Sequence, residues 1–110
     1  MNKYRSHNCS ELTANDSGCE VYLAGWLHRK RDHGNLLFID LRDHFGITQC
    51  VIENKNKYFK ILENLRPESV IKVYGNVKKR ELGTENKDLK TGSIEINIDN
   101  FEILSEAVSF

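Results

Sequence analysis

The clearest strand pattern in this chain is the segment Leu36-Leu37-Phe38-Ile39-Asp40-Leu41-Arg42-Asp43. Side chains alternate between the two faces of an extended strand, so one face would carry Leu37, Ile39 and Leu41. Phe38 then shares the opposite face with Asp40 and Arg42. A large apolar ring among charged neighbours gains no core packing, which indicates a flat surface that stays available for a planar ligand. The unpaired bases of a nucleic acid are the natural candidate.

Strand patterns continue on both sides of this segment. Alternation begins at Glu20, and one face of this first strand would carry Val21, Leu23 and Leu27. The basic run His28-Arg29-Lys30-Arg31 and the turn signal Asp32-His33-Gly34-Asn35 follow. We therefore place four side chains in the loop that joins the first two strands: Arg29, Lys30, Arg31 and His33. After a second turn at residues 43–46, a third strand is expected from Ile47 to Glu53.

One helix is expected after the third strand. Asn54 can cap it, Pro67 ends it, and apolar residues recur at three- and four-residue spacing at Tyr58, Ile61, Leu62 and Leu65. A fourth strand would bury Ile71, Val73 and Val77. After a polar loop that ends at Gly92, a fifth strand would bury Ile94, Ile96 and Ile98. The tail from Phe101 to Leu104 is expected to pack back on the other strands.

Five strands with one helix between the third and fourth is the order of the OB-fold, an all-β, five-stranded, partly open Greek-key barrel. We assign residues 20–110 to this barrel and residues 1–19 to an N-terminal segment, in which a short helix can start at Ser10 and end near Gly18. Oligonucleotides bind this fold on strands two and three and on the loops that join strands one to two and four to five. Phe38, Gln49 and the start of the fifth strand at Glu95 belong to that face.

Composition restricts the class of protein. A chain of 110 residues forms one domain with its own core. The 16 basic and 16 acidic residues balance, so the chain does not hold duplex phosphates through bulk charge. The basic runs at residues 28–31 and 78–80 favour a local nucleic-acid surface over the simpler alternative of two solvated strand ends. The absence of a membrane-length apolar stretch and of a secretion signal predicts the cytoplasm, where Cys9, Cys19 and Cys50 would stay free thiols.

No metal site or catalytic site is expected. The four histidines and three cysteines lack the spacing of zinc ligands. Asp40, Arg42 and Asp43 are expected to make ion pairs and turn contacts, because a metal-dependent nuclease needs carboxylates that converge from several strands. The chain is therefore expected to bind its partner without catalysing a reaction and without a cofactor of its own.

Several motifs together resemble one protein family. They are Gly25-Trp26-Leu27, the run Arg29-Lys30-Arg31-Asp32-His33-Gly34, residues 37–43, Gly46-Ile47-Thr48-Gln49-Cys50-Val51, and Thr91-Gly92-Ser93-Ile94-Glu95-Ile96. In this combination they resemble the amino-terminal anticodon-binding domain of bacterial-type aspartyl-tRNA synthetases, over nearly the whole chain from Tyr4 onward. The corresponding loops of the lysine and asparagine enzymes, which have the same fold, are less similar.

The resemblance implies a role for each matching residue. In the family, the strand-two aromatic stacks on the middle anticodon base, and Phe38 stands in its place. The family's glutamine and glutamate that make polar contacts with anticodon bases are matched by Gln49 and Glu95. Arginines that contact anticodon bases or backbone are matched by Arg29 and Arg31.

Two further positions are implied less directly. Asn86 lies in the variable loop that approaches the first anticodon base in the family. His33 stands where family members carry leucine or histidine, and histidine is typical of non-discriminating enzymes, which charge both aspartate and asparagine tRNAs. Those two anticodons differ only in the third base. A turn histidine without any such role is the alternative.

The resemblance also implies a longer parent protein, an ATP-dependent, homodimeric class II aspartate-tRNA ligase whose catalytic domain uses ATP and Mg²⁺. The expected partner of this chain is aspartate tRNA, alone or together with asparagine tRNA. No association with a membrane is expected. Three alternatives stay open from the residues: a general single-stranded nucleic-acid-binding OB module, a free-standing tRNA-binding paralogue, and a small hydrolase or nuclease.

Overall fold

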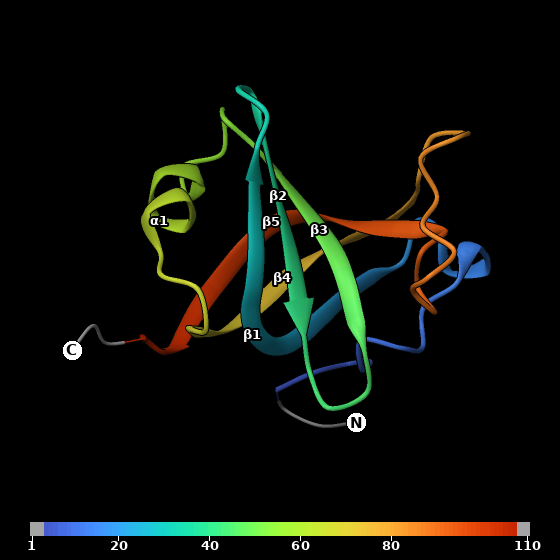
Figure 1. Ribbon diagram of the computed structural model, residues 1–110, viewed down its shortest axis with the longest axis horizontal. Coiled ribbons are helices and arrows are strands. Elements are labelled where there is room, and N and C mark those ends of the chain that lie inside the picture. Colours follow the sequence, from blue (N-terminus) through green and yellow to red (C-terminus); the bar gives the residue numbers. More distant parts are fainter. Residues whose placement is uncertain (1–3, 108–110) are drawn as a thin grey trace.

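Five strands form a closed barrel in the computed structural model, which describes residues 4–107. The elements in chain order are a 3-10 helix (Ala14–Asp16), β1 (Glu20–Asp32), β2 (Leu36–Arg42), β3 (Ile47–Glu53), α1 (Phe59–Asn64), β4 (Val70–Lys79) and β5 (Ile94–Ser105). Around the barrel the order is β1-β2-β3-β5-β4 (Figure 1). The β3–β5 pair is parallel and the other pairs are antiparallel. The predicted fold class, with the helix between β3 and β4, is confirmed, but the barrel is closed and not partly open, because β3 pairs with β5.

The barrel interior is filled by alternate side chains of every strand. The predicted inward residues of β2 are at most 1% exposed, and Phe38 lies on the outer face as expected. The corresponding apolar residues of the other strands are also buried, and Phe59 and Leu62 of α1 join the same core. Because this core is closely packed, it fixes the positions of β1, β2 and β3 and therefore also the outer face that these strands share.

Strand β1 is longer than predicted and includes the basic run. Arg29, Lys30 and Arg31 pair with β2, and the turn is confined to residues 33–35, so our placement of these three side chains in a loop was wrong. The register shifts at a bulge between Leu27 and Arg29. Charged residues extend the strand because β2 completes their backbone hydrogen bonds and a cross-strand ion pair stabilises the pairing. Of the four residues, His33 alone lies in the turn.

The helix is shorter than predicted. It begins at Phe59, because Asn56 donates its side-chain amide to the carbonyl oxygens of Ile98 and Asp99 and ties residues 54–58 to β5 as a series of turns. Ile61, which we expected in the apolar stripe, is 51% exposed.

Both ends of the described chain also differ from expectation. The predicted tail from Phe101 to Leu104 is the continuation of β5, where it pairs with β4. Near the start of the chain, Thr13 caps the 3-10 helix, and no helix starts at Ser10.

Lys30 has a structural role that sets it apart from the other basic residues of β1. Its Nζ donates to the main-chain oxygens of Glu63 and Leu65 at 2.7 and 2.6 Å, and no basic residue of α1 itself lies in the last turn. Burial lowers the pKa of this ammonium group. Lys30 therefore caps the C-terminal end of α1 and fastens it to the far end of β1.

We expect Lys30→Met to lower the free energy of unfolding by about 1–3 kcal/mol, because two charge-assisted hydrogen bonds are lost. Denaturant unfolding followed by circular dichroism measures the change. Lys79→Met, at an exposed position of β4, is the control and should change stability by less than about 0.5 kcal/mol. Equal stability of the two variants would contradict the capping role.

Candidate nucleic-acid interface

The outer face of β1, β2 and β3 arranges polar and aromatic side chains in rows. In one row Phe38 lies between Arg31 of β1 and Val51 of β3, and in the next Asp40 lies between Arg29 and Gln49. The Phe38 ring is partly exposed, and the His33 ring meets it edge-on with a centroid distance of 5.2 Å and an angle of 80°. The aromatic platform predicted from the alternation of β2 is therefore on the outside of the barrel.

A chain of hydrogen bonds crosses four strands next to this ring. The Arg31 guanidinium donates to both oxygens of Asp40, at 2.9 and 3.1 Å, and to Gln49 Oε1 at 2.8 Å. Gln49 Nε2 donates in turn to Glu95 Oε1 at 2.9 Å. Because arginine only donates and an ionised carboxylate only accepts, the Gln49 amide can have only this orientation.

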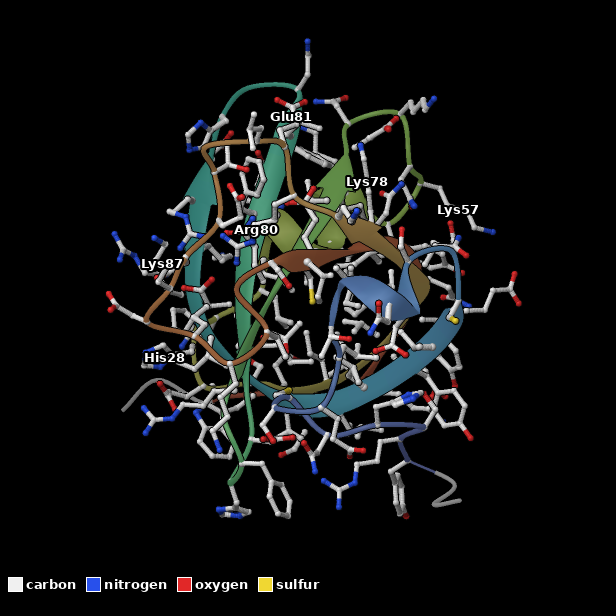
Figure 2. All side chains as sticks on the ribbon, turned by 90° about the vertical axis from the view of Figure 1, so that its right-hand side faces the viewer. His28, Lys57, Lys78, Arg80, Glu81 and Lys87 are labelled. Carbon is white, nitrogen blue, oxygen red and sulfur yellow. The ribbon has the colours of Figure 1, made fainter. Side chains whose placement is uncertain are left out.

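A hollow of about 470 Å³ lies beside this chain, between the strands and the loop of residues 80–93. It is lined mainly by polar groups, among them His28, Arg29, Arg31, Gln49, Arg80 and Asn86. In Figure 2 the labelled Arg80, His28 and Lys87 lie on the side of the barrel along which this loop runs. The wall of the hollow is therefore rich in groups that donate hydrogen bonds to phosphate or base acceptors.

Arg80 is a charged residue of this hollow that the sequence interpretation did not select. Its Nε donates to the oxygen of Ile94 and its Nη1 to that of Thr84, at 3.0 and 3.2 Å. The buried Nη2 has no hydrogen-bond partner within residues 4–107. Burial lowers the pKa of the guanidinium, and the nearby carboxylates of Glu95 and Asp40 oppose that shift. The only sequence signal was the basic run at residues 78–80, which does not distinguish Arg80 from the two exposed lysines before it.

All seven predicted site residues lie on this side of the barrel. Arg29, Arg31, Gln49 and Asn86 line the hollow, Glu95 is bonded to Gln49, and Phe38 and His33 touch each other at the end of the face nearest the β1–β2 turn. Chemically, the arrangement offers a ring for stacking, carboxylate acceptors and several fixed donors. These are the groups that bind an unstacked base by its face, its edge and its phosphate.

Within residues 4–107 no cluster of histidine, cysteine, aspartate or glutamate side chains has a geometry that could hold a metal ion. In the same part of the chain, no helix has the length and apolar character needed to cross a membrane. Cys9, Cys19 and Cys50 are free, and the first and last of them are buried.

Comparison with known proteins assigns the fold to a family. Residues 21–104 match the tRNA anticodon family, which is described as an OB-fold nucleic acid binding domain. The chain belongs to this family. The matched region includes all seven predicted site residues and every strand except the first residue of β1 and the last residue of β5.

The relatives of this OB-fold domain are longer proteins. It is 58% identical over 104 residues to the aspartate–tRNA(Asp/Asn) ligase of Pelagibacter ubique. This alignment covers 94% of the present chain and 18% of that ligase. It is 52% identical over 107 residues to the ligase of the same name from Methylorubrum extorquens, with 97% and 18% coverage. The chain thus spans less than a fifth of the length of these relatives and aligns with one domain of each.

Solved structures agree with this assignment. Asparaginyl-tRNA synthetase from Pyrococcus horikoshii superimposes with a TM-score of 0.79 at 27% identity, over 94% of this chain and 24% of the synthetase chain. Aspartyl tRNA synthetase from Entamoeba histolytica gives a TM-score of 0.83 at 19% identity, over 92% of this chain and 21% of the synthetase chain. At this identity the similarity shows a common fold.

Proposed function

We propose that this chain binds the anticodon loop of aspartate tRNA, as the recognition module of an aspartate-tRNA ligase. The observation that supports this most is the outward Phe38 ring, one row along the strands from Gln49, which is bonded to Glu95 and lines a basic hollow. A stacked ring holds a splayed base without selecting its identity, so identity must come from hydrogen bonds to the base edge. Phe38 would stack on a base, and Gln49 and Glu95 would form hydrogen bonds with anticodon base edges. Arg29, Arg31 and Arg80 would donate hydrogen bonds to acceptors of the backbone or the bases.

Acceptance of asparagine tRNA as well is a finer part of the same proposal. Two features support it: relatives named aspartate–tRNA(Asp/Asn) ligase, and the His33 ring against the edge of Phe38 at the end of the binding face. A polar ring at this point can donate or accept a hydrogen bond, and so can tolerate either of two pyrimidines as the third base.

The catalytic steps belong, in this proposal, to the part of the relatives that this chain does not span. ATP and Mg²⁺ would be bound there, in a homodimeric ligase of the cytoplasm. The 110 residues would discriminate between tRNAs without catalysing aminoacylation.

The test is a titration of the chain with anticodon stem-loops for aspartate, asparagine and lysine, and with an unrelated single strand of the same length, at two salt concentrations. We expect similar dissociation constants for the first two and at least about tenfold weaker binding of the others, since one lost base contact costs roughly 1–3 kcal/mol. A large preference for the aspartate stem-loop over the asparagine stem-loop would contradict the proposal that the chain accepts both tRNAs. Equal affinity for all four ligands would instead support a general single-strand-binding module.

A further inference from the structure

Asp40 lies at the start of the hydrogen-bonded chain but is not among the residues assigned a contact with nucleic acid. Its side chain is 16% exposed and that of Arg31 is 28% exposed, so the pair is largely shielded from water. Both Asp40 oxygens are engaged by the two terminal nitrogens of Arg31. Such a bidentate pair fixes the plane of the guanidinium as well as its position.

The fixed Arg31 determines what Gln49 and Glu95 offer to a ligand. One of its nitrogens is shared between Asp40 and Gln49 Oε1, so the amide points its Nε2 at Glu95 Oε1. Glu95 Oε2 accepts no hydrogen bond within residues 4–107 and is the acceptor left for the N–H groups of a guanine or cytosine edge.

Without the charge of Asp40, Arg31 would have another carboxylate close by. Glu95 lies just beyond Gln49, on β5, and opposite charges at this range attract strongly where water is partly excluded. Arg31 would then pair with Glu95 and occupy the acceptor that a base needs. Arg29 and Arg80 also lie near Asp40 and contribute to the positive potential of the hollow.

We propose that Asp40 is a positioning residue for base recognition: it touches no base, but it holds Arg31 away from Glu95 and so keeps Gln49 and Glu95 oriented for the base edge. This inference rests on the proposed function. It predicts that the removal of the Asp40 charge lowers discrimination between bases and does not lower affinity in general.

The experiment compares two ligands, the aspartate anticodon stem-loop and the same stem-loop with an anticodon base other than the third exchanged, because the third base is the one that distinguishes the aspartate from the asparagine anticodon. For Asp40→Asn we expect the ratio of the two dissociation constants to fall by about tenfold or more, the scale of one charge-assisted hydrogen bond. Affinity for the exchanged stem-loop should stay equal or rise, because a negative charge is removed beside a phosphate-binding surface. In the free protein, the side-chain amide NMR signals of Gln49 should shift or broaden.

Two variants serve as controls. Asp88→Asn removes the same charge from an exposed position of the neighbouring loop and should leave the ratio unchanged. Asp40→Glu keeps the charge and should keep the ratio within about threefold of wild type, since the main requirement is an anionic partner for Arg31. If Asp40→Asn does not fold, Asp40→Ser replaces it with a smaller neutral group.

The outcomes separate the two proposals. A wild-type chain that binds both stem-loops equally contradicts the proposed function. A wild-type chain that discriminates, together with an Asp40→Asn chain that discriminates equally well, overturns the role of Asp40 alone. A parallel fall of both affinities with the free energy of unfolding would show a purely structural role and would also overturn it.

Discussion

Phe38→Ala should weaken binding of the aspartate anticodon stem-loop by about 5- to 150-fold and leave the barrel folded. Stacking of one base on an aromatic ring contributes roughly 1–3 kcal/mol, and alanine offers no face for it. The ring lies on the outer face of β2, whose buried residues are its neighbours on either side, so the core loses little. Fluorescence anisotropy measures the dissociation constant, and thermal unfolding measures the stability.

Phe45→Ala is the matched control for this variant. Phe45 is a more exposed phenylalanine than Phe38, 52% accessible in the turn that follows β2, with the Arg5 guanidinium 5.0 Å from its ring centroid. It lies at the other end of β2 from Phe38 and does not line the hollow beside Gln49. Its loss should change affinity by less than about threefold. Equal weakening by both substitutions would argue for a diffuse aromatic surface and against a stacking position at Phe38.

The barrel was predictable because apolar and polar residues alternate over most of β2, β4 and the first parts of β1 and β5. Leu37, Ile39 and Leu41 point inward, and the same alternation placed Phe38 outside, which needs no knowledge of strand pairing. The helix was predictable only in part, because Ile61 fits a helical period with Tyr58 and Leu65, Phe59 fits one with Leu62, and the sequence does not show whether Ile61 or Phe59 faces the barrel.

The hydrogen bonds that connect the site residues to one another were not predictable from the sequence. Arg31 reaches Asp40 and Gln49 because β1 continues through the basic run, and a run of charged residues has no apolar alternation that would indicate a strand. The Gln49–Glu95 contact depends on the parallel pairing of β3 with β5, two strands separated by a helix and another strand. The roles of the seven residues toward a base stay predictions, although their common location is now a fact of the structure.

Gly92 supports the loop that forms one wall of the hollow. Its oxygen accepts a hydrogen bond from Asn86 N, at 2.9 Å, and its own N donates to Leu89 O at 3.1 Å. A Cβ at this position would overlap the carbonyl group of Asn86, far inside van der Waals contact. The neighbouring Thr91 is fully buried and bonded to Thr48 and to the oxygen of Ile47, so this end of the loop cannot move aside. The strain of an added methyl group must therefore fall on Asn86 and the residues before it.

We expect Gly92→Ala to weaken stem-loop binding by more than about tenfold, equivalent to about 1.4 kcal/mol, because a displaced Asn86 segment takes with it the Thr84 oxygen that holds Arg80. The core is untouched, so the free energy of unfolding should fall by less than about 2 kcal/mol. Gly83→Ala, in the same loop, is the control: its φ of 88° costs alanine about 1–2 kcal/mol, but the new Cβ would meet no atom within 4 Å. Affinity of that variant should stay within about threefold of wild type. If Gly92→Ala binds as tightly as Gly83→Ala, the loop wall and Arg80 take no part in holding the ligand, and the interface is limited to the strand face around Phe38.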